Sequence, residues 1–178
     1  MIKTKNIIAA LGVVAGLGAT AVPLAVHAVS GVDAVVTVSV GSQLSLSIDS
    51  STVSIPVDAG GAKNDVKSVL TVSTNTAGYN ITVKDTTGDG SLVHSVNNSF
   101  KITPITDGSE PKAGDGKWGI KVGDSWFGVS NDAKTIKTTS GGAVTNETTN
   151  VFYGVGTSAN QAAGDYSATI HYEVTANN

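Results

Sequence analysis

The 178-residue sequence contains no cysteine and no arginine, and only 5% of its residues are aromatic. Without cysteine, no disulfide can hold the fold together. The eleven basic residues are all lysine and are outnumbered by fourteen acidic residues, which gives a formal net charge of −3. Nucleic-acid-binding proteins usually present a basic face rich in arginine, and anionic lipid surfaces attract basic segments. The composition therefore argues against both kinds of partner.

The N-terminus is predicted to be an export signal, residues 1–28. Residues 1–6 carry two lysines, residues 7–26 are apolar and uncharged, and small residues precede a cleavage point after Ala28. These are the three parts of a secretory signal peptide. An uncleaved anchor is the alternative, because an apolar run of about 20 residues is long enough to cross a bilayer. Cleavage leaves residues 29–178, and these 150 residues (178 − 28) suffice for a single domain with its own core.

Period-two alternation of apolar and polar residues dominates this domain and predicts half-buried strands. The 21 glycines and the many serines, threonines and valines agree with short strands joined by turns. We therefore predict an all-β fold, an antiparallel β-sandwich of Ig-like or Greek-key type with about 8–10 strands, and a barrel as the alternative. The segments expected as strands are residues 32–40, 44–48, 53–57, 66–72, 79–83, 100–102, 117–129 (a hairpin), 151–155 and 166–174. The segments expected as long loops are residues 86–98 and 107–116, and the polar segment 131–150 is expected to be a loop or to contain a short hairpin around Ser140-Gly141-Gly142.

No residue pattern typical of catalysis is found. His94 is expected in a loop and His171 on the outward face of the last strand, and neither has metal-ligand spacing to other residues. We expect no catalytic residues, no cofactor and no metal. Calcium is the alternative, because several carboxylates lie in turns, but the triplets around Asp89 and Asp115 are better explained as tight turns.

Three aromatic residues are the candidates for ligand binding. Trp118, Trp126 and Phe127 can present flat faces to a sugar or a surface partner, although large aromatic side chains are also needed to fill a core. Trp126 and Phe127 are adjacent, so they point to opposite faces of a strand and one of them should be partly exposed.

The C-terminal run from Ala163 to Val174, AGDYSATIHYEV, resembles the closing strand of the WxL-type surface domains of Gram-positive bacteria. In that family a Gly-x-Tyr-x-Ala strand ends in a Trp-x-Leu element, and a second such element lies upstream. Here Tyr172-Glu173-Val174 stands in the final position and Trp118-Gly119-Ile120 in the upstream one. The same strand is similar to those of fimbrial-type surface β-sandwiches. The resemblance implies a secreted protein that binds the cell wall noncovalently.

These observations predict a secreted, non-enzymatic protein at the cell surface or cell wall. Its partner is expected to be a cell-wall polymer or a surface protein or glycan, with no membrane contact once the signal is removed. The lack of cysteine in an exported domain fits a Gram-positive type of surface. One alternative is a pilus or fimbrial-type subunit, in which residues 32–40 complete a neighbour's sheet by strand exchange. The other is a secreted carbohydrate-binding module.

Overall fold

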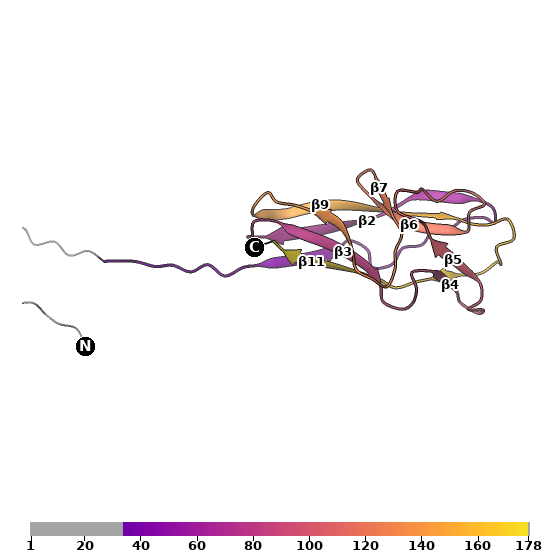
Figure 1. Ribbon diagram of the computed structural model, residues 1–178, viewed down its shortest axis with the longest axis horizontal. Helices are drawn as coiled ribbons and strands as arrows, with labels where there is room; N and C mark the ends of the chain where they lie inside the picture. Colours follow the sequence, from indigo (N-terminus) through magenta and orange to yellow (C-terminus); the bar gives the residue numbers. More distant parts are fainter. Residues whose placement is uncertain (1–33, 178) are drawn as a thin grey trace, which may run out of the picture. The chain divides into compact units, whose positions relative to one another are not determined.

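The computed structural model describes residues 34–177 of the chain (Figure 1). It divides into two units, Met1–Ser39 and Val40–Asn178, which are treated separately. In the first unit, the described residues 34–39 contain no strand and are exposed, so the strand predicted at residues 32–40 is not formed here. The predicted signal peptide and its cleavage after Ala28 lie outside the described residues.

The prediction of an all-β fold is confirmed: residues 34–177 form strands, turns and extended segments, with no helix. The number of strands is higher than expected. In chain order they are β1 (Leu44–Ile48), β2 (Ala62–Thr74), β3 (Tyr79–Asp85), β4 (Leu92–His94), β5 (Lys101–Pro104), β6 (Lys117–Val122), β7 (Ser125–Phe127), β8 (Lys134–Thr138), β9 (Val144–Gly156), β10 (Tyr166–Ser167) and β11 (Ile170–Ala176).

The larger sheet has the order β1-β2-β9-β6-β5-β4-β10 and curls strongly into a half-barrel. Strand β5 pairs with β6 at Lys117 and Trp118, and β7 pairs with a later part of β6, at residues 120–122. The sheet is mixed, because β5 runs parallel to β6, with Thr103 opposite Lys117. This corrects the expectation of a wholly antiparallel fold. A parallel neighbour needs a long crossover, and the segment between β5 and β6, expected as a loop, supplies it.

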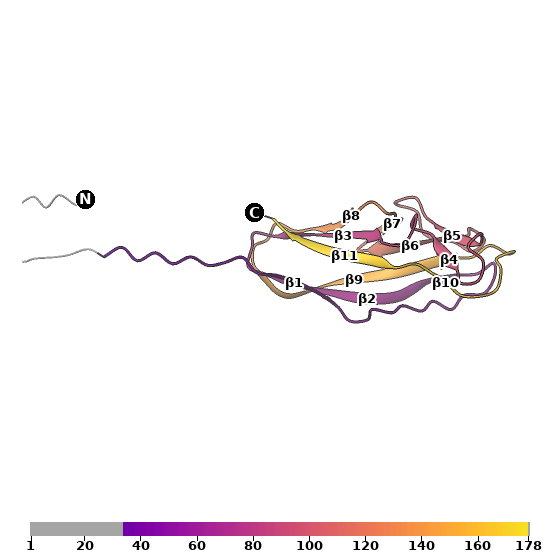
Figure 2. The ribbon, with the colours of Figure 1, turned by 90° about the horizontal axis from the view of Figure 1, so that it is seen from below.

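The smaller sheet has the order β11-β3-β8 and is antiparallel throughout. In Figure 2 it lies on one side of the molecule, with β1, β2 and β9 on the other. Alternate residues of β3 point into the space between, and Tyr79, Ile81 and Val83 are almost fully buried there. They pack with buried residues of the large sheet: Leu70, Val72, Ile102, Trp118, Ile120, Val151, Tyr153 and Val155.

The last apolar run, residues 166–174, was expected to form one strand, but it serves both sheets. Tyr166 and Ser167 of β10 pair with β4 in the large sheet. From Ile170 onward, β11 pairs with β3 in the small sheet. Between the two strands, the Thr169 carbonyl accepts a hydrogen bond from the Thr86 backbone N–H (2.9 Å), which marks the crossing point.

One predicted hairpin is confirmed, and several predicted strands and loops differ from the structure. The β6–β7 hairpin is confirmed, with Gly123 at φ +59° in the two-residue turn between Val122 and Ser125. Residues 53–57 are extended but form no strand. The expected loop at 86–98 contains β4. Residues 131–150 contain β8 and the start of β9, but these two strands pair with other strands, so they do not form the hairpin considered around Ser140.

Candidate functional site

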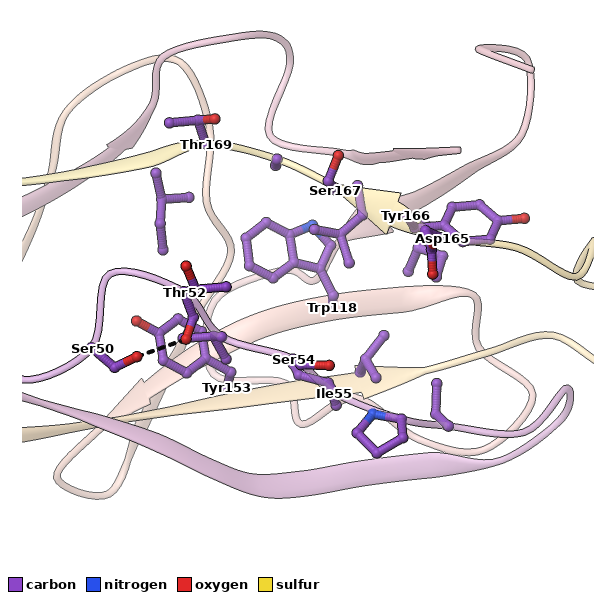
Figure 3. A pocket seen from close by; sticks show the side chains of 18 of the residues that line it. Ser50, Thr52, Ser54, Ile55, Trp118, Tyr153, Asp165, Tyr166, Ser167 and Thr169 are labelled. Atoms are coloured by element: carbon purple, nitrogen blue, oxygen red, sulfur yellow. Dashed lines mark hydrogen bonds between the residues drawn. The ribbon is translucent and has the colours of Figure 1, made fainter. Parts of the chain in front are cut away.

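An open apolar cleft of about 1250 Å³ lies along one side of the domain. One wall is formed by β1 and the segment that follows it, and the other by β10, β11 and the residues between them (Figure 3). We call this feature the edge cleft. Its apolar lining comprises Leu46, Ile48, Val53, Ile55, Val57, Leu70, Leu92, Ile102, Trp118, Tyr153, Val155, Tyr166, Ala168, Ile170 and Tyr172.

The first wall is an extended segment whose backbone has no strand partner. Along residues 50–57, Val53, Ile55 and Val57 are half-buried against the core, while Ser54 and its alternate neighbours are exposed. Among residues 34–177, no protein group accepts a hydrogen bond from the backbone N–H groups of this segment. The register of β1 with β2 ends at Ile48 and Leu70. The wall therefore has the shape and side-chain alternation of a strand but lacks a strand's hydrogen bonds.

The second wall is the outer edge of β11 with the residues leading to it. Tyr166, Ala168, Ile170 and Tyr172 face inward and are half-buried, and the residues between them are exposed. Strand β11 pairs on one side with β3 and on the other side with no strand of the described chain. Equivalent inward residues of β3 are almost fully buried. The core is thus complete under β3 and open along β11.

Aromatic side chains form the floor of the edge cleft. The Trp118 ring lies between the two walls (Figure 3), and its Nε1–H donates to the Gly90 carbonyl (2.7 Å). The hydroxyls of Tyr153 and Tyr172 are 3.1 Å apart and hydrogen bond to each other. Burial and the neighbouring Tyr153 hydroxyl raise the pKa of Tyr172, so this side chain stays neutral at physiological pH. The floor is uncharged, which favours an apolar occupant.

A tight turn between β3 and β4 fixes the position of Trp118. The Asp85 carboxylate accepts hydrogen bonds from the backbone N–H groups of Thr87 (2.8 Å) and Gly90 (2.9 Å). Burial raises the pKa of Asp85, but these hydrogen bonds more than offset it, so the pKa lies below its usual value. Gly90 has φ +86°, and a Cβ there would lie 2.0 Å from the Val129 carbonyl oxygen. Only glycine therefore fits where the chain presents its carbonyl to the indole.

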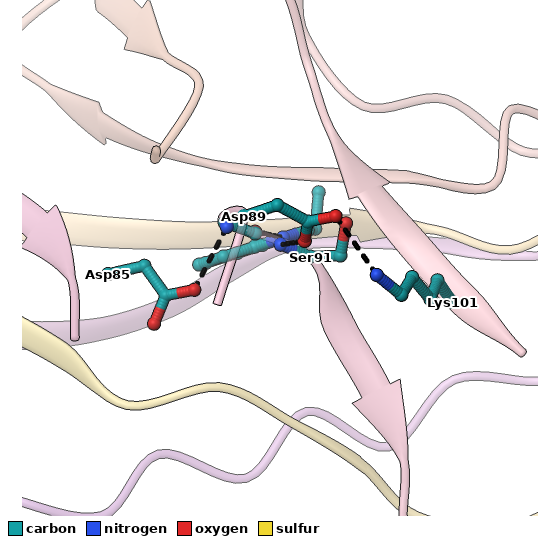
Figure 4. A network of polar contacts seen from close by, with 6 residues as sticks. Asp85, Asp89, Ser91 and Lys101 are labelled. Atoms are coloured by element: carbon teal, nitrogen blue, oxygen red, sulfur yellow. Dashed lines mark hydrogen bonds and ion pairs between the residues drawn. The ribbon is translucent and has the colours of Figure 1, made fainter. Parts of the chain in front are cut away.

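The same turn is tied to β5 on its solvent side (Figure 4). The Asp89 carboxylate accepts from the Ser91 N–H (3.0 Å) and pairs with the Lys101 ammonium (2.9 Å). The Lys101 hydrogen bond, followed by those from Ser91, lowers the pKa of Asp89. The carboxylates around Asp89, considered above as calcium ligands, are thus engaged within the turn. Among residues 34–177, no group of three or more His, Cys, Asp or Glu side chains is arranged to hold a metal ion.

The three aromatic candidates are not brought together into one site. Trp118, 3% exposed, lines the edge cleft. Trp126, 7% exposed, packs on Gly154, where an added Cβ would lie 2.5 Å from the ring. Phe127 is half-buried, and neither it nor Trp126 lines the cleft.

The histidines also differ from each other. His171 is exposed, as expected, but His94 is buried in β4 rather than lying in a loop. Its Nδ1 accepts from the Val96 N–H (3.1 Å), and its Nε2–H donates to the Ala163 carbonyl (3.0 Å). The ring stacks edge-on against Tyr166 at 5.0 Å between centroids. His94 therefore holds β10 in place.

The aromatic residues named from the sequence do not mark the two walls of the cleft. The walls are visible in the sequence only as alternating runs, and such a run indicates an open edge when there are too few other strands to cover it. No protein-family model matches the sequence, and no curated protein matches it either. The described residues include no helix long and apolar enough to span a membrane.

Proposed function

We propose that this chain is an exported, non-enzymatic protein of the cell surface, and that it acts by binding an extended segment of another surface protein in the edge cleft. One observation carries the proposal: two half-buried apolar rows face each other across the cleft, and residues 34–177 supply no strand partner to residues 50–57 or to the outer edge of β11. Addition of a strand to such an edge supplies main-chain hydrogen bonds for affinity and side-chain pockets for specificity.

The chemistry of the edge cleft favours a protein segment over a sugar. Sugar rings stack on exposed aromatic faces, but Trp118 and Trp126 are only 3% and 7% exposed. The walls instead present apolar side chains at a spacing of two, aliphatic except for Tyr166 and Tyr172, which matches the alternation of a β-strand. Association with the cell wall, as the WxL resemblance implies, would then run through a wall-bound protein.

The proposal also accounts for the predicted sandwich. The half-barrel and the small sheet face each other across the core; β1 lies close to β11, and the edge cleft opens beyond it, between residues 50–57 and the residues leading into β11. A strand bound there would join residues 50–57 to this second wall and complete a closed, Ig-like arrangement. In that view the fold is a sandwich with one position left for a partner.

A sedimentation experiment tests this function. The exported chain, with its N-terminus determined by mass spectrometry, is mixed with purified cell walls from the producing cells. One wall sample keeps its proteins and the other is treated with protease. We expect wild type and Ser45→Asp to sediment with untreated walls, and Ile55→Asp to stay in the supernatant, because Ile55 lines the cleft whereas Ser45, exposed on β1, does not.

The protease-treated walls identify the class of partner. Loss of binding after protease treatment supports a protein segment as the occupant. Equal binding to treated walls, or equal binding by Ile55→Asp and wild type, contradicts the proposal. Circular dichroism of both variants verifies that they are folded.

A further inference from the structure

We infer that the segment bound in the edge cleft is residues 34–40 of a second copy of this chain, called here the donor segment. This inference rests on the proposed function, because both require the cleft to accept a strand. Each copy offers one donor segment and one cleft, which are different surfaces. A contact of this heterologous kind repeats from copy to copy and builds a head-to-tail polymer.

The donor segment has the side-chain pattern of a strand whose apolar face is uncovered. Val36, Val38 and Val40 lie on one face by alternation and are 84%, 79% and 82% exposed. Between Asp33 and Asp49 no residue is charged. Exposed strands are normally protected from pairing by charged residues or proline. The donor segment has neither charged residues nor proline, so nothing in its sequence prevents it from pairing with the edge of another sheet.

The donor segment also fits the edge cleft in length and spacing. Seven extended residues span about 23 Å at about 3.3 Å per residue. One wall of the cleft, residues 166–172, is itself seven residues long. On the other wall, Val53, Ile55 and Val57 offer three apolar side chains at the same period-two spacing as the donor's valines.

Residues 41–43, which connect the donor segment to β1, are extended. Within the described chain, Gly41 is not among the glycines with positive φ. The Asn75 side chain holds this stretch by accepting from the Gln43 N–H (2.7 Å) and donating to the Gly41 carbonyl (2.9 Å). These two bonds on one side keep residues 41–43 extended.

Matched substitutions in the donor segment give the first test. The exported full chain is compared with Val36→Asp, Val38→Asp and, as control, Val35→Asp, which lies on the opposite face. Analytical ultracentrifugation over a concentration series measures assembly. We expect wild type and Val35→Asp to form multimers, and the other two to assemble about tenfold or more weakly, because a charge replaces a buried valine. Equal assembly by all four chains, or a strictly monomeric wild type, overturns the inference.

Engineered cysteines give a second test that does not depend on assembly strength. Because the chain has no cysteine of its own, each disulfide can be assigned. A Val38→Cys chain is mixed and oxidised with chains carrying Val53→Cys, Ile55→Cys or Val57→Cys. We expect a mixed dimer with at least one of the three, and far less with Ser45→Cys, which is exposed on β1 and does not line the cleft. No preference for inward positions contradicts strand donation.

Walls from a strain lacking this gene separate the two proposals. If wild type and Val38→Asp bind such walls equally while Ile55→Asp does not, a different protein occupies the cleft, and self-assembly is refuted while the proposed function stands. If binding requires copies already on the wall and is lost in Val38→Asp, self-assembly is supported.

Discussion

The edge cleft makes a quantitative prediction about two isoleucines. Ile81 on β3 is fully buried, whereas Ile55 on the cleft wall is half-buried. Ile→Ala removes three carbons, worth about 0.8 kcal/mol each when fully buried. A cavity term adds to this inside a core, so Ile81→Ala should lower the free energy of unfolding by about 3–4 kcal/mol.

The same truncation at Ile55 should cost less. At most about a third of this residue is exposed, which reduces the transfer term only to about 2 kcal/mol. The truncated site opens onto the cleft, so no closed cavity forms. Ser54→Ala, one residue away and exposed, is the control and should change the free energy of unfolding by less than about 0.5 kcal/mol.

Urea unfolding of dilute, monomeric protein measures these differences by linear extrapolation, provided that the m-values agree. A cost at Ile55 equal to that at Ile81 would refute the reasoning, since it would mean that the cleft is closed in solution. If strand addition also occurs, the cost of Ile55→Ala should rise with protein concentration, because a ligand of the folded state stabilises it by mass action.

Two further predictions concern the turn under Trp118. Since hydrogen bonds lower the pKa of Asp85 in the folded state, the unfolded state binds the proton more tightly, and this contribution to stability is lost as the pH falls below about 4. Asp85→Asn should therefore weaken the acid dependence of the free energy of unfolding in urea titrations at several pH values, and an unchanged pH profile would contradict this. Gly90→Ala should cost about 2 kcal/mol or more in thermal or urea unfolding, because its Cβ would meet the Val129 carbonyl. Gly123→Ala is the matched control: its φ is +59° and its Cβ would meet no atom within 4 Å, so it should cost only about 1 kcal/mol.

Local signals in the sequence predicted the strands but not their partners. Alternation placed β1 and β3, and the Gly123-Asp124 turn placed the β6–β7 hairpin. The parallel pairing of β5 with β6 depends on where a long connection returns, which no local pattern records. Short strands such as β4 were missed because three residues are too few to show a period.

The candidate site was predictable only in part. Its residues differ from those of ordinary strands only because no neighbouring strand covers them, and a sequence pattern does not record this. Trp118 was named for its size and does line the cleft, but as the floor rather than as an exposed platform. The walls were visible as alternating runs, and nothing in those runs distinguished them from ordinary strands. The division of residues 166–174 between two sheets also had no marker in the alternation.

Three alternating runs together indicate that the fold lacks one strand. Period-two alternation predicts a segment with one covered face, and β3 fulfils this with almost complete burial. The donor segment, residues 53–57 and β11 carry the same pattern, yet their apolar side chains remain exposed or half-buried. Within residues 34–177, each lacks a backbone partner along at least one edge. Insertion of the donor segment between the other two covers all three apolar rows at once, and therefore accounts for the shared pattern with a single contact.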